Sequence, residues 1–175
     1  MCDVKPLLNC QRQVKELEAQ IAELTKPEPV PEIQKWGIQR YYFVEKLKEF
    51  NIDTFPQNVD FVLDQWLYCT TMEGWGEVLY DLVLDSDLYQ KDIYDCEDYA
   101  LKAQCICAEK YGLNSFRMCI GDMPQGKHGF NIFFEHTEDD GIGDIYLFEP
   151  NGGFEHSGEA FKIGEHGYFP QVVLI

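Results

Sequence analysis

The stretch Tyr94-Asp95-Cys96-Glu97-Asp98-Tyr99-Ala100-Leu101 is the most informative part of the sequence. It has the composition of a helix start, with Asp95 as a favoured N-cap residue and two carboxylates in the first turn, where the helix dipole stabilises them. Small and apolar residues then recur at helical spacing until Gly112, a typical C-terminal stop. Cys96 is therefore predicted at a helix N-terminus, whose unpaired N–H groups favour a thiolate over a thiol. The alternative interpretation is a buried structural cysteine, because cysteine is among the most buried residue types.

Two predicted strands follow this helix and add a histidine and a carboxylate. The first strand opens at Gly126-Lys127-His128-Gly129, and the second ends at Glu149. A thiol nucleophile needs a base to accept its proton, and the imidazole of that base needs a third group to orient it. The order along the chain predicts a catalytic site made of Cys96, His128 and Glu149. Asp144, which precedes the second strand, is the rival to Glu149.

A resemblance to a known family rests on these same residues. Asp95-Cys96-Glu97-Asp98-Tyr99-Ala100-Leu101 resembles the D-C-E-D-[YF]-A-L block of bacterial transglutaminase-like cysteine proteinases, and the segment around His128 resembles that family's G-H-A-[VF] strand. The match covers residues 90 to 152. The resemblance implies an α+β fold of the transglutaminase/papain-like type, in which the nucleophile helix packs on an antiparallel sheet. The family usually carries Asp where this sequence offers Glu149.

The resemblance also implies cysteine-dependent acyl transfer. Cys96 would attack a carbonyl carbon, His128 would hold and return the proton, and Glu149 would orient His128. Hydrolysis of an amide bond by a protease or amidase is favoured, because water is always available as the acceptor. Two alternatives stay open: a non-catalytic oligomeric binding or assembly module on the same fold, and a protein cross-linking transglutaminase. This chemistry needs no metal or organic cofactor, and a protein or peptide is the expected substrate.

Composition limits the partners and the compartment. The 175 residues carry a formal net charge of −17, so nucleic acids and anionic membranes should be repelled and cationic partners attracted. High solubility explains the same charge equally well. The seven cysteines are irregularly spaced and form no C-x-x-C pair, and no hydrophobic leader precedes them. A reducing, cytoplasmic compartment is therefore expected, with no membrane span.

The N-terminal segment carries a heptad pattern. Its apolar positions are Leu7, Val14 and Ile21 in one register and Cys10, Leu17 and Leu24 in the other. This pattern predicts a coiled-coil helix over residues 1–26 that forms a homo-oligomer through residues 7–24, as a dimer or a trimer. The proline-rich residues 27–32 form a stiff linker, and residues 33–175 form the transglutaminase-like domain. A helix that packs on its own domain is the alternative for the first segment.

The remaining elements are predicted from hydrophobic spacing. We expect helices over residues 33–51, 57–69 and 77–84, with a break at Gly74-Trp75-Gly76. We expect strands near residues 115–120, 128–135, 145–149 and 171–175. The other histidines, His136, His156 and His166, lack the setting of His128 and are interpreted as structural.

Overall fold

The computed structural model describes residues 13–18, 20–21, 29–56, 64–138 and 141–175. The chain divides into two compact units, Met1–Val30 and Pro31–Ile175. In the first unit, residues 13–18 and 20–21 are helical, and the side chains of Val14, Leu17 and Ile21 are exposed. The other heptad positions, Leu7, Cys10 and Leu24, lie outside the described residues, so the coiled coil stays a prediction. Among the described residues, no helix is both long enough and apolar enough to cross a membrane.

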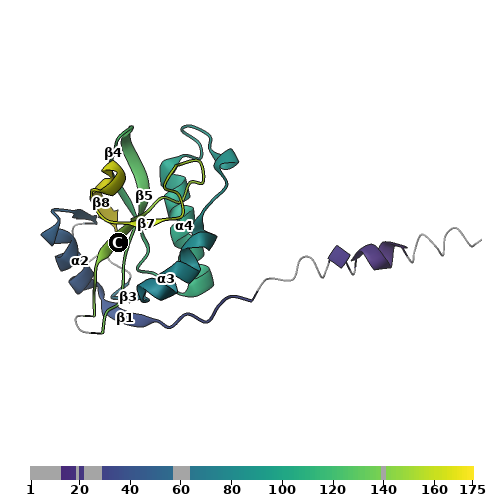
Figure 1. Cartoon of the computed structure of the whole chain (residues 1–175), viewed down its shortest axis with the longest axis horizontal. Coiled ribbons are helices and arrows are strands. Elements are labelled where there is room, and N and C mark those ends of the chain that lie inside the picture. The colour runs from purple at the N-terminus through teal and green to yellow at the C-terminus, as the bar shows by residue number, and fades with distance from the viewer. Residues whose placement is uncertain (1–12, 19, 22–28, 57–63, 139–140) are drawn as a thin grey trace, which may run out of the picture. The chain divides into compact units, whose positions relative to one another are not determined.

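A mixed sheet organises the second unit (Figure 1). Within the described residues its six strands lie in the order β2 (Asp53–Phe55), β8 (Phe169–Leu174), β4 (Arg117–Met123), β5 (Gly126–Phe134), β6 (Ile145–Phe148) and β7 (Ala160–Phe161). The β2–β8 pair is parallel, and the other neighbours are antiparallel. A separate two-stranded antiparallel sheet joins β1 (Trp36–Gln39) to β3 (Trp66–Cys69).

Each face of the six-stranded sheet packs against a hydrophobic core. The side chains of β5 alternate between these two cores. Phe130, Ile132 and Phe134 point into one core, where Phe134 lies 4.9 Å from Phe43 between ring centroids. Phe133 points into the other core, 4.6 Å from the ring of Trp75. The first core includes residues of α2 (Arg40–Glu49), and the second includes residues of α3 (Met72–Leu79) and α4 (Cys96–Tyr111). Figure 1 accordingly shows α2 on one side of the strands, with α3 and α4 on the other.

Helix α4 begins and ends where its capping residues predict. The backbone N–H of Asp95 donates to the carboxylate of Asp98 at 3.2 Å, and Gly112 ends the helix with a φ of 66°. That left-handed conformation favours glycine because it has no Cβ. Short 3-10 turns, η2 (Tyr80–Leu82), η3 (Ser86–Leu88) and η4 (Glu165–Gly167), complete the regular structure of the described residues.

Two predicted helices before Cys96 are wrong in part, although α2 lies within the first of them. Residues 36–39 and 66–69 were predicted as helix but form β1 and β3, since they pair with each other across a large sequence separation. Residues 57–63 of the second predicted helix lie outside the described residues. The expected break at Gly74-Trp75-Gly76 is also wrong, because α3 runs through it. The hydroxyl of Thr71 accepts the N–H of Gly74 at 3.3 Å and so caps the start of α3.

Candidate functional site

A close approach between α4 and β5 places Cys96 beside His128. A Cβ atom at Gly129 would lie 2.9 Å from the Cα of Glu97 and 3.2 Å from the carbonyl carbon of Cys96. A side chain at position 129 would therefore separate the helix from the strand. The contact is reinforced further along β5, where the buried Asn131 amide donates to the carbonyl of Ala100 at 2.9 Å. The first turn of α4 is thereby held against the start of β5.

His128 and Glu149 form a buried ion pair. The distance between His128 Nε2 and Glu149 Oε2 is 2.7 Å, and the two side chains are 6% and 1% exposed. Tyr168 donates its hydroxyl to Glu149 Oε2 at 3.1 Å, and the backbone N–H of Asn151 donates to Oε1 at 3.0 Å. Glu149 thus accepts three hydrogen bonds, which compensate for burying its charge. Phe154 covers the His128 ring at a centroid distance of 4.9 Å.

These neighbours change the protonation of His128. Burial disfavours the charged imidazole, but hydrogen bonds with Cys96 and with Glu149 outweigh burial and raise the pKa of His128 to about 9. His128 is therefore protonated at neutral pH, with the Cys96 sulfur on one side and the Glu149 carboxylate on the other. The Cys96 thiol also lies 3.4 Å from the Glu97 carboxylate. This arrangement places a thiol beside a protonated imidazole that a buried carboxylate orients.

The other described cysteines lie in different surroundings. Cys69, Cys107 and Cys119 are buried, and burial raises the pKa of each thiol, that of Cys69 to about 12. Cys105 is exposed on α4. All the cysteines in the described part of the chain are free thiols. Cys105 therefore provides a natural comparison for Cys96 on the same helix.

Asp144, the rival to Glu149, pairs with a different residue. Its carboxylate lies 2.5 Å from the Lys162 amine, and its side chain is 69% exposed. This ion pair lowers the pKa of Asp144. The structure thus brings Cys96, His128 and Glu149 together and leaves Asp144 outside the group. Whether the three residues are catalytic stays a prediction.

Sequence reasoning missed a second feature, an open hollow of about 400 Å³ beside β1 and α2. Its lining combines exposed aromatic rings, including Trp66 and Tyr42, with the polar side chains of Gln39, Lys46 and Glu49. Trp66 is 48% exposed and Tyr42 is 57% exposed, which is unusual for rings of this size. The signal available in the sequence was the cluster of aromatic residues around positions 41–42 and 66–68. The prediction of inward-facing rings on two helices is wrong, because Trp66 lies on β3 and the ring of Tyr42 is exposed although it lies on α2.

No family model and no curated protein matches the chain. A comparison with solved structures does find proteins of similar fold. One neighbour is PSL1a, solved as a complex with E64, with a TM-score of 0.56 and 16% identity over 79% of this chain and 51% of that chain. Another is the Polyporus squamosus lectin, bound to the human-type influenza-binding epitope Neu5Aca2-6Galb1-4GlcNAc, with a TM-score of 0.56 and 15% identity over 79% and 49% of the two chains. The chain spans about half the length of these neighbours. Likeness at this identity shows a shared fold.

These neighbours correct the family assignment. The predicted membership in the bacterial transglutaminase-like cysteine proteinases is wrong, because the fold is shared with PSL1a and with the Polyporus squamosus lectin. The transglutaminase/papain-like fold class and the cysteine-dependent amide hydrolysis inferred from that membership are wrong for the same reason. The physical cause is the small extent of the resemblance, which covered residues 90 to 152 and in detail only a helix start and a strand start. Proteins of different folds can contain the same short helix start and strand start, so neither the fold nor the function follows from that local match.

Proposed function

We propose that this chain is a ligand-binding domain whose ligand is a carbohydrate. The fold shared with the Polyporus squamosus lectin supports this assignment. The observation that carries it is the hollow beside β1 and α2, where exposed aromatic rings lie next to amide, carboxylate and amine groups. Open pockets that combine apolar rings with a few polar groups are the usual form of small-ligand sites.

The chemistry of the hollow suits a sugar ring. A pyranose has an apolar C–H face that packs on an indole or phenol ring, and its hydroxyls pair with amides and carboxylates. Trp66 and Tyr42 supply the rings, and Gln39 and Glu49 supply the polar groups. Lys46 is already paired with Glu49 at 3.2 Å, so the hollow offers no unpaired cation for an acidic sugar. With a net charge of −17 on the whole chain, a neutral saccharide is the expected ligand.

Glycan-array binding tests this proposal. Trp66→Ala should lower the affinity for bound neutral glycans at least about tenfold, because a central aromatic anchor contributes roughly 1.4 kcal/mol or more. Tyr80→Ala is the matched control, since Tyr80 is 88% exposed and does not line the hollow. The array includes Neu5Aca2-6Galb1-4GlcNAc as the sialylated member. Binding to no glycan, or equal binding by both variants, would contradict the proposal.

A second candidate function rests on Cys96, His128 and Glu149. The buried His128–Glu149 pair beside a partly exposed thiol favours covalent capture of an electrophilic ligand at Cys96. PSL1a was solved as a complex with E64, and E64 carries an epoxide, a group that thiolates open. In the proposed step the Cys96 sulfur bonds to an epoxide carbon, the carbon–oxygen bond breaks, and His128 gives its proton to the oxygen. E64 is therefore a suitable probe of this centre.

The heptad of residues 7–24 leads to a separate proposal about assembly. Sedimentation of the full chain should show a dimer or trimer, because exposed apolar residues such as Val14 and Leu17 recur on the helix at coiled-coil spacing. Replacing Val14 and Leu17 together by Ser should give a folded monomer. The matched control replaces Lys15 and Glu18, which lie between the apolar positions, by Ser. A monomeric full-length chain would remove the coiled-coil interpretation.

A further inference from the structure

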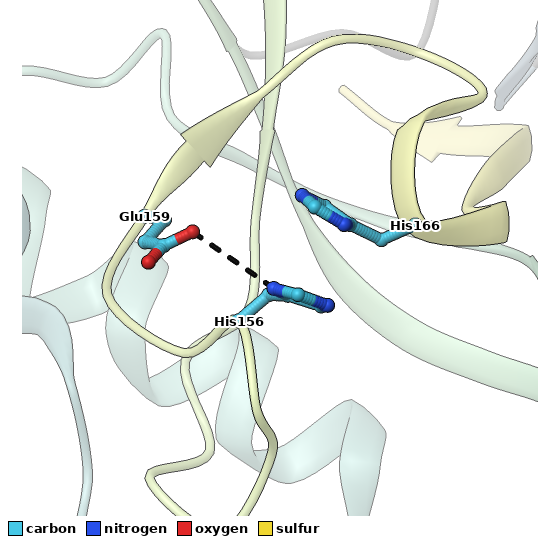
Figure 2. A group of neighbouring side chains, drawn as sticks. All are labelled: His156, Glu159 and His166. Carbon is cyan, nitrogen blue, oxygen red and sulfur yellow. Dashed lines mark ion pairs between the residues drawn. The ribbon is translucent and has the colours of Figure 1, made fainter.

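A cluster of two histidines and a glutamate lies outside the Cys96 centre. His156 belongs to the loop between β6 and β7, Glu159 immediately precedes β7, and His166 belongs to η4. The two imidazole rings stack with a centroid distance of 3.5 Å and an interplanar angle of 17°. Glu159 Oε2 lies 3.9 Å from His156 Nδ1, and Figure 2 shows the carboxylate and both rings gathered on one side of the loop.

The surrounding backbone holds these side chains in place. His166 has a φ of 54°, a left-handed conformation that is uncommon for a residue other than glycine. Hydrogen bonds on both sides of η4 maintain it, since Gly164 N–H donates to the carbonyl of Tyr168 at 2.8 Å and Tyr168 N–H donates to that of Glu165 at 3.0 Å. These hydrogen bonds restrain the backbone that carries His166, whose ring stacks on that of His156. Both rings border a hollow of about 160 Å³.

We propose that His156, Glu159 and His166 bind a divalent transition-metal ion, with Zn²⁺ as the expected occupant. Two imidazole nitrogens and one carboxylate oxygen form a ligand set that zinc accepts, and water fills the fourth position. The candidate ligand atoms all lie within 4.8 Å of one another. Zinc bonds of about 2.0–2.2 Å place tetrahedral ligands about 3.3 Å apart. Because the lone pair of an imidazole nitrogen lies in the plane of its ring, the two stacked rings must rotate out of their stack to bind one ion. Calcium and magnesium prefer oxygen ligands and fit this set poorly.

The metal would connect the two segments that flank the His128–Glu149 pair. Phe154, two residues before His156, packs on the His128 ring at 4.9 Å. Tyr168, two residues after His166, donates its hydroxyl to Glu149 at 3.1 Å. An ion joining His156 to His166 would therefore restrain both neighbours of the buried pair. Metal binding at the loop and ligand binding at Cys96 should influence each other reciprocally.

Paramagnetic NMR on the full chain tests the site without any variant. The sequence has four histidines, so His128 and His136 act as internal controls. Substoichiometric Co²⁺ should broaden the side-chain signals of His156 and His166 and leave that of His136 sharp. A competing cluster of Asp95, Cys96 and Glu97 exists among the described residues. Binding there would broaden His128 first and produce thiolate-to-cobalt charge-transfer absorption, and this result would overturn the proposal.

Calorimetry with Zn²⁺ supplies the quantitative test in a Cys96→Ser background, which removes that competing thiol. Glu159→Gln should weaken Zn²⁺ binding more than tenfold, since loss of an outer-shell partner alone costs about 10- to 100-fold. Glu109→Gln removes the same charge from an exposed position on α4 that does not border the hollow, and it should leave the affinity unchanged. His166→Asn should also weaken binding, and asparagine tolerates the left-handed backbone. Equal affinities for the Glu159 and Glu109 variants would overturn the proposal.

Discussion

Iodoacetamide is expected to modify Cys96 in the native protein at least about tenfold faster than Cys105 at neutral pH. Both thiols lie on α4 and neither is buried, but only Cys96 has a protonated imidazole and a helix N-terminus beside it. Mass spectrometry of the labelled peptides measures both rates in one sample.

The His128→Ala variant identifies the source of this reactivity. It should lower the rate at Cys96 to that of Cys105, while His136→Ala, which removes another partly buried imidazole, should leave the rate unchanged. E64 should label the native chain at Cys96 and fail to label the His128→Ala variant. If Cys96 is no faster than Cys105, or if loss of His128 has no effect, the covalent-capture function is wrong. The carbohydrate proposal would be unaffected, because the hollow is lined by other residues.

The second large effect concerns Glu149. In Glu149→Gln the pKa of His128 should fall from about 9, because burial remains and, of the two groups that oppose it, Cys96 and Glu149, the carboxylate is lost. NMR titration of the His128 side chain measures this change directly. Asp144→Asn is the matched control, since Asp144 pairs with Lys162 and should leave the titration near 9. A His128 that still titrates near 9 without Glu149 would contradict the assigned role of the carboxylate.

The raised pKa of His128 also makes the free energy of unfolding depend on pH. Because the pKa of His128 is raised from 6.5 to about 9, proton binding favours the folded state. That contribution is complete below about pH 6.5 and is lost as the pH rises through about 9. The free energy of unfolding of the native chain should fall by at most roughly 3 kcal/mol over this window, measured by urea denaturation. In Glu149→Gln the decline over this window should be smaller, because only Cys96 then opposes the burial of the imidazolium.

The sequence predicted those parts of the site that depend on local chemistry. Asp95 and Gly112 are capping residues whose effect is felt within one helix, so the bounds of α4 could be read directly. The strand that carries His128 was predicted from a continuous apolar run, and it is buried along most of its length. The order of residues around it then predicted a group of Cys96, His128 and Glu149. These three side chains come from one continuous stretch of the chain, the helix α4 and the three strands β4, β5 and β6 that follow it.

Features that depend on pairing between segments far apart in the sequence could not be predicted. The strands β1 and β3 exist because Trp36–Gln39 pairs with Trp66–Cys69, and each segment alone has a spacing compatible with a helix. The hollow beside β1 and α2 was also not predicted, because residues from β1, α2 and β3, together with Ile142, line it and meet only in the folded chain. The stacking of His156 on His166 depends on the left-handed backbone at His166, for which the sequence gives no signal. The family assignment was wrong because it extended a local match to the whole framework.

The strand order determines when the six-stranded sheet can be completed during synthesis on the ribosome. Strand β8 lies between β2 and β4, so it occupies an interior position although it follows every other strand of the sheet in sequence. Until Phe169–Leu174 has emerged, β2 has no partner and β4 presents an open edge. Tyr168, the residue before β8, also supplies the hydroxyl that binds Glu149. The nascent chain therefore stays incomplete and prone to edge pairing until this last strand inserts, and the acid beside His128 gains its full set of partners in the same late event.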